Sequence, residues 1–134
     1  MKTELMVESI ELIKETMPNS FEEFQALGLA KDGIYKRLEF AIQCILDICS
    51  QIAHEQEMVS FGYKDLVNNL AENGIISSEL KEKLFFLVDL REILIYNYDL
   101  MSDEIAFRNV PEYIEYIEAF LKEAPWRRDL IRTR

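Results

Sequence analysis

The sequence has few of the residues that break helices and few of those that build covalent or metal crosslinks. Its 134 residues include only 4 Gly, 3 Pro, 2 Cys and 1 His. So little glycine and proline excludes collagen-like and low-complexity chains. An apolar share of 49% also excludes a disordered chain, which cannot bury enough apolar surface to offset the entropy lost on folding. This length fits one core, so we expect a single helical domain over residues 1–134.

The chain also lacks long hydrophobic runs. The longest unbroken apolar run, from Leu84 to Val88, is far below the roughly 18 residues that a membrane span needs. The N-terminal residues lead into a charged amphipathic pattern instead of the apolar region of a signal peptide. We therefore expect a cytoplasmic protein that does not associate with a membrane.

Positive charge is scarce: 15 Lys and Arg stand against 25 Asp and Glu, a net charge of −10. Residues 126–134 hold four Arg and one Asp (+3), so residues 1–125 carry −13. Such an acidic body repels polyanions at long range, which argues against DNA binding and against a broad basic face for nucleic acid. A contact with RNA or nucleotide would be local or would use the basic tail at 123–134, although we favour the interpretation of that tail as a solubilising or partner-docking terminus.

The cysteines and the histidine have no spacing that indicates chemistry. Cys44 and Cys49 are five residues apart on one predicted helix, which places them about 140° apart around its axis and disfavours a disulfide. No nearby histidine completes a zinc site, and we expect neither a metal nor a cofactor. We interpret both cysteines as small buried residues and His54 as a surface group that stabilises a helix end.

Apolar residues recur with helical spacing along the whole chain and nowhere with the alternation of a strand. The pattern therefore predicts an α-helical bundle without internal repeats. The expected helices span approximately residues 3–15, 20–28, 32–57, 60–74, 78–99 and 102–121.

Turn and capping residues set these boundaries. Ser20 with Glu23 three residues later has the spacing of a capping box. Gly74 is placed to end a helix, and Pro111 is expected to kink or restart the last one. Four further polar residues are the expected N-terminal caps: Asp32, Ser60, Ser78 and Ser102.

The predicted helix at 78–99 is unusually apolar, since ten of the thirteen residues from 84 to 96 are apolar. A helix that is apolar on nearly all sides is buried on nearly all sides, and in a domain this small we expect one face to meet a second subunit. Asp89, Arg91 and Glu92 are the polar exceptions. From periodicity alone they form a narrow solvated edge on which the two carboxylates screen the arginine.

Three segments share the pattern of one known family. Residues 91–99 read Arg-Glu-Ile-Leu-Ile-Tyr-Asn-Tyr-Asp and are followed by Ser-Asp-Glu-Ile at 102–105. They resemble the signature of HepT-like HEPN proteins: Arg, a polar residue, three mostly apolar residues, His, any residue and Tyr. Residues 37–48 resemble the long second helix of this family, and residues 63–76 resemble its helix that ends in Ala-Glu-x-Gly and two hydrophobic residues. The similarity covers roughly residues 30–123, with the three segments in the family's order.

The resemblance implies an up-and-down bundle of four or five helices, of the HEPN or nucleotidyltransferase substrate-binding type, that forms a homodimer through the helix at 78–99. It also implies the toxin of a type VII toxin–antitoxin pair whose partner is a minimal nucleotidyltransferase (MNT). Active members are metal-independent ribonucleases with a cleft between two subunits. In them the His handles the proton of the RNA 2′-hydroxyl, and the Arg stabilises charge on the phosphorus-centred transition state.

The resemblance assigns roles to individual residues. Arg91 matches the signature arginine, and Tyr98 matches the tyrosine to which the MNT partner attaches AMP. Tyr96 stands where the family has His, and Glu92 where it has Asn, Asp or His. A phenol, with an ordinary pKa of about 10, is a poor general base near neutral pH, and the amide of Asn97 cannot take the proton. We therefore predict Arg91 and Tyr96 as the catalytic pair of a ribonuclease whose activity is weak or lost.

Tyr98 follows Arg91 by seven residues, which on an ideal helix returns it to within about 20° of the same stripe. We expect both side chains to open into one cleft, although an amphipathic residue at the bundle edge has the same spacing. Two other functions stay open. One is a catalytically inactive HEPN dimer that binds a nucleotide or the nucleotidyltransferase, and the other, without the family, is a plain helical dimerisation protein.

Overall fold

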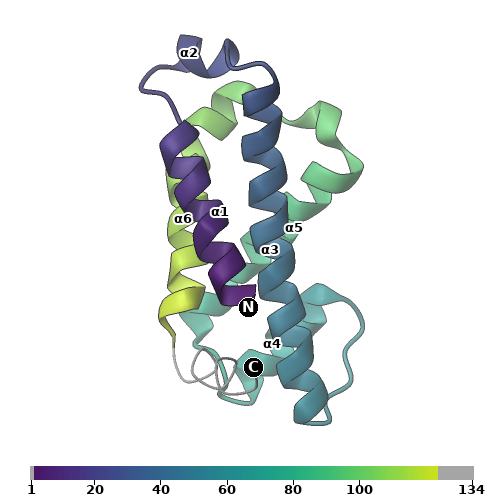
Figure 1. The fold of residues 1–134 in the computed structure, drawn as a ribbon. Helices are drawn as coiled ribbons and strands as arrows, with labels where there is room; N and C mark the ends of the chain where they lie inside the picture. The colour runs from purple at the N-terminus through teal and green to yellow at the C-terminus, as the bar shows by residue number, and fades with distance from the viewer. Residues whose placement is uncertain (1, 124–134) are drawn as a thin grey trace.

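The computed structural model describes residues 2–123, which form a bundle of helices joined by short connections (Figure 1). An all-α fold is therefore confirmed. The basic tail lies outside the described residues from position 124 onward. The elements in chain order are α1 (Lys2–Thr16), α2 (Phe21–Gln25), α3 (Leu29–Glu55), α4 (Tyr63–Glu72), α5 (Ser78–Tyr96), the 3₁₀ turn η1 (Tyr98–Leu100) and α6 (Asp103–Lys122).

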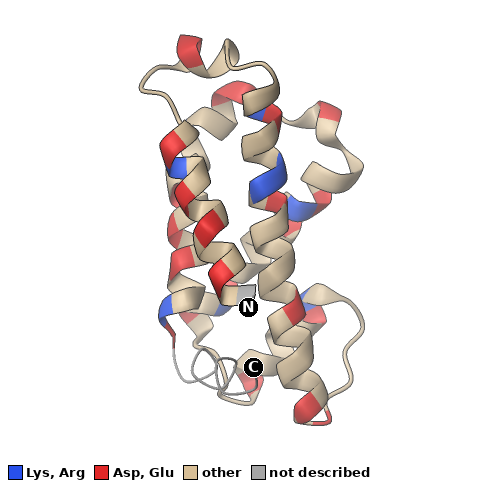
Figure 2. Ribbon diagram, in the orientation of Figure 1, with Lys and Arg blue, Asp and Glu red and all other residues tan. Residues whose placement is uncertain are grey.

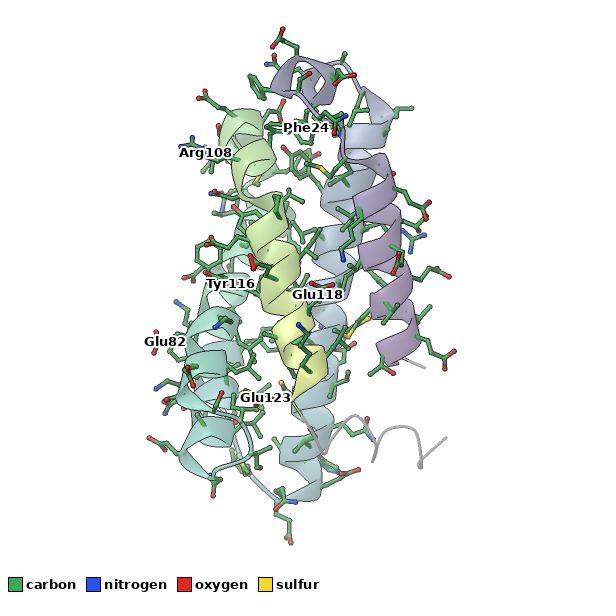
Figure 3. All side chains as sticks on the ribbon, turned by 90° about the vertical axis from the view of Figure 1, so that its left-hand side faces the viewer. Phe24, Glu82, Arg108, Tyr116, Glu118 and Glu123 are labelled. Atoms are coloured by element: carbon green, nitrogen blue, oxygen red, sulfur yellow. The ribbon has the colours of Figure 1, made fainter. Side chains whose placement is uncertain are left out.

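The central helix is α3, which packs against α1, α4, α5 and α6. Burying one Leu or Ile side chain contributes roughly 1.5–3 kcal/mol, so this shared apolar face holds the bundle together. Lys14 of α1 adds an ion pair to Glu118 of α6 at 3.0 Å, at the surface between these two helices (Figure 3). The buried residues of α3 follow the helical spacing that the sequence predicts: Ile34, Leu38, Ala41, Ile42, Ile45, Ile48 and Cys49.

The near-continuous apolar sequence of α5 has an internal explanation, because α3, α4 and α6 all pack against this helix. Phe86 is one example: its ring lies 5.6 Å from that of Tyr113 and 5.7 Å from that of Tyr116 on α6. Neighbours within one chain thus cover more of α5 than the sequence argument assumed. In the C-terminal half of α5 the face that stays exposed consists of Asp89, Glu92, Ile93 and Tyr96, and Phe86, one turn earlier, keeps 41% exposure despite its ring contacts.

Two of the expected caps are confirmed. The Ser20 hydroxyl accepts from the Glu23 N–H at 3.1 Å, and the Ser102 hydroxyl accepts from the Ile105 N–H at 3.3 Å. Gly74 has a φ of 74°, a left-handed conformation that glycine adopts at little cost, directly after the end of α4.

The other three expected caps are wrong. Ser77 rather than Ser78 caps α5, accepting from the Leu80 N–H at 3.1 Å. α4 begins after Gly62, because the Ser60 hydroxyl is used by the side chain of Asn69 instead. α3 begins after Gly28, which places Asp32 inside the first turn and leaves its carboxylate free for another partner.

The ends of α5 and the course of α6 also differ from expectation. α5 ends at Tyr96 instead of Asp99, because Asn97 leaves the helical region with φ −137° and ψ 43°. The expected restart at Pro111 is wrong, since α6 runs through it as one helix. Val110 before the proline and Tyr113 after it are both buried in the core, and this packing offsets the roughly 3 kcal/mol cost of an internal proline.

Candidate functional site

Arg91 is held against the bundle and does not extend into bulk solvent. Its Nε donates a hydrogen bond to Oε1 of Gln43 on α3 at 2.7 Å, and its guanidinium lies 5.0 Å from the centre of the Tyr63 ring on α4. Neither contact uses the two terminal nitrogens, and no group within residues 2–123 hydrogen-bonds to them. A guanidinium fixed in this way presents a planar fork of donors that matches the oxygens of a phosphate.

Gln43 is itself oriented by its neighbours. Its amide nitrogen donates to Oδ1 of Asp47, one turn along α3, at 2.9 Å and lies 3.5 Å from the hydroxyl of Tyr63. The amide oxygen therefore faces Arg91. The expectation that Asp89 and Glu92 screen the arginine is wrong, because Asp89 pairs with Lys64 at 2.8 Å and Glu92 is exposed.

The surface charge of the bundle reflects the excess of acidic over basic residues in the sequence. Acidic residues recur along the helices, and the few basic residues are scattered among them (Figure 2). No broad basic face surrounds the site among residues 2–123, so we expect any binding of an anion at Arg91 to depend on that side chain.

Tyr98 lies in η1, beyond the end of α5. Its hydroxyl donates to Oδ1 of Asp32 at 2.5 Å, and its ring packs edge-on against Tyr35 with 5.6 Å between ring centres. The side chain keeps 42% of its surface exposed. Partial burial, the hydrogen bond to Asp32 and the negative charges of Asp32 and Asp103 raise the pKa of Tyr98 above its ordinary value, so the hydroxyl stays protonated at neutral pH.

The expectation that Arg91 and Tyr98 share one helical stripe is wrong. The stripe argument holds only within a continuous helix, and α5 ends at Tyr96. Arg91 contacts α3 at Gln43, whereas Tyr98 contacts it at Asp32, eleven residues earlier. At 1.5 Å per residue these two points are about 16 Å apart along α3. Within one copy of the chain, the two side chains belong to separate places.

Tyr96 is the last residue of α5 and is 68% exposed. It follows Arg91 by five residues, which on a helix is a rotation of about 140° away from the side that carries the arginine. No hydrogen bond or ring contact joins the two in the part of the chain that the structure describes. Asn97 is exposed at the helix end, where its N–H bonds to the Ile93 carbonyl at 3.0 Å.

A second tyrosine–carboxylate pair lies beside the first. The Tyr35 hydroxyl donates to Oδ1 of Asp103 at 2.7 Å, and Lys31 lies 2.6 Å from the other oxygen of that carboxylate. Burial works to raise the pKa of Asp103, but the bonds from Lys31 and Tyr35 outweigh it and the pKa is lowered. A cavity of about 300 Å³ opens here, lined by Asp32, Tyr35, Lys36, Glu39, Leu94 and Tyr98.

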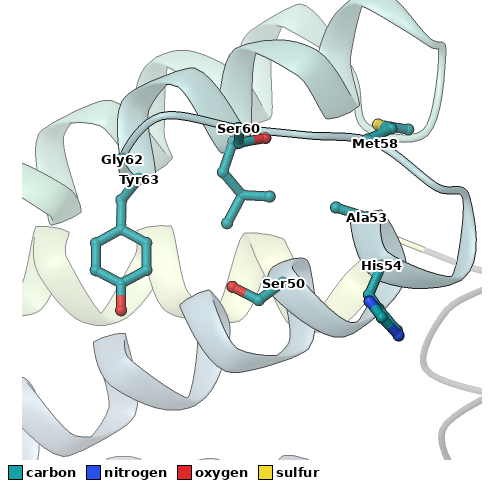
Figure 4. A pocket seen from close by; sticks show the side chains of 8 residues that line it. Ser50, Ala53, His54, Met58, Ser60, Gly62 and Tyr63 are labelled. Carbon is teal, nitrogen blue, oxygen red and sulfur yellow. The ribbon is translucent and has the colours of Figure 1, made fainter.

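Another cavity, of about 270 Å³, lies between the C-terminal end of α3 and the start of α4 (Figure 4). His54 borders it from the last turn of α3, the position expected for a group that stabilises a helix end. Tyr63 borders the other end and links this cavity to the ring contact with Arg91. Besides His54 and Tyr63, its lining consists of Ser50, Ala53, Met58, Ser60, Gly62 and Leu66, none of which is titratable.

Both cysteines are buried and form no disulfide within residues 2–123, and burial raises the pKa of the Cys49 thiol to about 12. Within residues 2–123 no cluster of His, Cys, Asp and Glu is arranged to hold a metal ion. None of the helices in that range is long and apolar enough to cross a membrane.

Sequence reasoning missed the residues that hold the predicted site in place, namely Gln43 and Tyr63 for Arg91, and Asp32 and Tyr35 for Tyr98. One signal was present for Gln43. Together with Asp47 it makes a polar pair at helical spacing within a stretch of α3 that is otherwise buried.

The described residues thus form an all-helical bundle with one arginine anchored between three helices and a tyrosine just beyond the end of one of them. The family profile described as Ribonuclease HepT-like matches residues 6–124. The chain belongs to the HepT-like family.

Individual relatives agree with this assignment. The mRNA nuclease HepT of Shewanella oneidensis is 25% identical over 92 residues, which cover 68% of this chain and 69% of that protein. A chain from a mutant form of the MntA–HpeT toxin–antitoxin complex superposes with a TM-score of 0.77 at 22% identity, covering 99% of this chain and 95% of that chain. A tri-AMPylated Shewanella oneidensis HEPN toxin, in complex with its MNT antitoxin, superposes with a TM-score of 0.64 at 21% identity, covering 97% and 98%. These structural likenesses confirm the fold.

Proposed function

We propose that this chain is the toxin of a type VII toxin–antitoxin module, a cytoplasmic HepT-like ribonuclease of reduced activity. A minimal nucleotidyltransferase neutralises it by attaching AMP to Tyr98. The proposal is carried by Arg91 of the family's signature segment, whose guanidinium is anchored by Gln43 and Tyr63 and whose terminal nitrogens donate to no group among residues 2–123. The relatives support it, since one is an mRNA nuclease and another is an AMPylated toxin in complex with an MNT antitoxin.

The chemistry requires a charge stabiliser and a proton acceptor. When the RNA 2′-hydroxyl attacks the neighbouring phosphorus, negative charge gathers on the phosphate oxygens, and a fixed guanidinium stabilises it. Removing one such donor typically costs about 10²–10³-fold in rate. Arg91 fits this role, and Tyr96 stands in the position of the proton acceptor, where its phenol performs poorly.

A second copy of the chain completes this site. Because Tyr96 is rotated away from Arg91, one copy does not bring the pair together. The exposed face of α5, formed by Asp89, Glu92, Ile93 and Tyr96, is the surface through which we propose that two copies associate. In such a dimer, two copies of Arg91 and two copies of Tyr96 line one cleft.

Ile93→Glu is expected to convert the dimer to a monomer, because it buries a carboxylate at the centre of the proposed interface. Light scattering at micromolar concentration measures the mass directly. Leu12→Glu on α1 is the matched control, since Leu12 is 38% exposed and Ile93 is 37% exposed; this variant stays dimeric. A wild-type chain that runs as a clean monomer would contradict the composite cleft.

One observation favours a second candidate function. Tyr96 replaces the family's His, so the same scaffold suits a catalytically inactive HEPN dimer that binds a nucleotide or the nucleotidyltransferase. This candidate shares the fold, the dimer and the partner with the first. It differs in cleaving no RNA under any condition, which an RNA gel with the purified chain decides.

Co-expression with a cognate minimal nucleotidyltransferase is expected to add AMP to Tyr98 and to relieve the growth defect that we expect the chain to cause alone. Intact-protein and peptide mass spectrometry locate the group. Tyr98→Phe carries no AMP and stays toxic, whereas Tyr35→Phe, which changes the buried neighbouring tyrosine, is modified as the wild type is. AMP that persists on Tyr98→Phe would show that the acceptor is another residue, and a plain dimerisation protein would gain AMP in no variant.

A further inference from the structure

The hydroxyl of Tyr98 has a proton acceptor in its own chain. Oδ1 of Asp32 lies 2.5 Å from the phenol oxygen, the shortest distance in this cluster of side chains. Asp32 is the fourth residue of α3 and does not cap it, because the helix starts after Gly28. The Asp32 carboxylate is thus not used to cap the N-terminus of the helix. It accepts the hydrogen bond from the Tyr98 hydroxyl, 66 residues away in the sequence.

The neighbouring pair shows what a purely structural tyrosine–carboxylate contact looks like in this fold. Tyr35 is only 3% exposed, and its acceptor Asp103 is bound by Lys31, which helps to lower the pKa of that carboxyl. Tyr98 is far more exposed, and Asp32 has no ion pair within residues 2–123. The carboxylate of Asp32 is therefore not held by a cation of the described chain, and Tyr98 is the tyrosine of the two that a partner protein can reach. The two pairs therefore differ in the two properties that a reaction at the hydroxyl needs.

A phenol that attacks phosphorus has to lose its proton. Its surroundings raise the pKa of Tyr98, so free phenolate is rarer here than on an ordinary tyrosine. Proton removal by a positioned base as the new bond forms avoids that penalty. The carboxylate of Asp32 is already in hydrogen-bonding contact with the atom that reacts.

We propose that Asp32 is the general base for transfer of an adenylyl group to Tyr98, an inference that rests on the proposed function of Tyr98 as the AMP acceptor. The phenol oxygen forms a bond to the α-phosphorus of ATP held by the nucleotidyltransferase. The bond from that phosphorus to the pyrophosphate oxygen breaks, and pyrophosphate leaves with the electron pair. The proton of the hydroxyl passes to the Asp32 carboxylate.

The cavity beside the hydroxyl is suited to receive the phosphate. It measures about 300 Å³ and is bounded by both Asp32 and Tyr98. Lys36 is the cation on its described lining, and its contact with Glu39 at 3.3 Å is a surface ion pair, which costs little to exchange for a phosphate oxygen. A base, a nucleophile and a cation thus border one opening.

Asp32→Asn separates the role of base from that of positioning, because the amide oxygen still accepts the hydrogen bond but cannot take the proton. With purified nucleotidyltransferase and ATP, we expect its rate of adenylylation, followed by mass spectrometry, to fall by about 100-fold or more. Asp99→Asn is the matched control: it makes the same change next to Tyr98, on an exposed carboxylate with no contact to the hydroxyl in the described chain. It retains the wild-type rate.

The pH profile gives a readout that a structural role would not move. The ratio of the Asp32→Asn rate to the wild-type rate is expected to rise about tenfold per pH unit above neutrality, because phenolate formed by hydroxide replaces the lost base. A variant as fast as the wild type, or a deficit that is the same at every pH, overturns the assignment of Asp32. A wild-type chain that gains no AMP at all overturns instead the proposed function of Tyr98, and the inference with it.

Discussion

Replacing Tyr96 with His is expected to raise the rate at which the purified chain cleaves RNA by about 10²–10⁴-fold. An imidazole with an ordinary pKa of about 6.5 accepts the proton of the 2′-hydroxyl near neutral pH, whereas a phenol does so poorly. The side chain lies exposed at the very end of α5, so the substitution removes little packing. A time course of labelled RNA on a gel measures the gain.

Tyr96→Phe is the matched control for this gain of function. It keeps the aromatic ring at the same position and removes the hydroxyl, so any residual proton transfer by Tyr96 is lost. Its rate is expected to fall below that of the wild type while Tyr96→His rises far above it. If Tyr96→His cleaves no faster than the wild type, the scaffold itself is not competent, and the inactive HEPN dimer becomes the better account of the chain.

Arg91→Ala is expected to lower RNA cleavage by about 10²–10³-fold, the usual cost of removing one preorganised donor from a developing oxyanion. The loss is best measured in the Tyr96→His background, where the starting rate is high. Thermal unfolding of the same variant has to accompany the assay, because the substitution also removes the contact with Tyr63 and the hydrogen bond to Gln43.

Arg91→Lys tests whether the geometry of the guanidinium contributes to RNA cleavage beyond its charge. Lysine keeps the charge but lacks both the planar fork and the Nε that donates to Gln43. A rate between those of the arginine and alanine variants indicates that geometry contributes beyond charge. Cleavage that survives Arg91→Ala undiminished cannot come from this signature segment, and would point to a contaminating nuclease or a different site.

Much of the fold was predictable from particular residues. The apolar residues at helical spacing on α3 are buried from Ile34 to Cys49, because a helix placed between several others must hide one face; Ile52, which the spacing also selects, is half-buried. The capping boundaries were less predictable. Ser60 and Ser78 are good caps by residue type, yet Gly62 and Ser77 take that position, since a hydroxyl can bond to other nearby groups at similar cost.

The candidate site was predictable only as a set of residue types. Arg91 could be found from the signature, but its anchors Gln43 and Tyr63 lie on other helices. The prediction that Arg91 and Tyr98 lie on one helical stripe is wrong because it requires the helix to continue to Asp99, whereas α5 ends at Tyr96. The non-helical backbone at Asn97 and the 3₁₀ turn that begins at Tyr98 were enough to place the tyrosine against the N-terminal end of α3.

The amino-acid pattern by itself determined that this chain is an all-helical bundle and that it carries the HepT-like signature, since both are properties of residues close together along the chain. Tertiary packing alone decided which polar groups form hydrogen bonds. Gln43 bonds to Arg91, which is 48 residues away in the sequence, and Asp32 bonds to Tyr98, which is 66 residues away. The reason is physical. Helical periodicity is a local consequence of backbone geometry, whereas contacts between helices depend on where each one ends and how its neighbours pack against it.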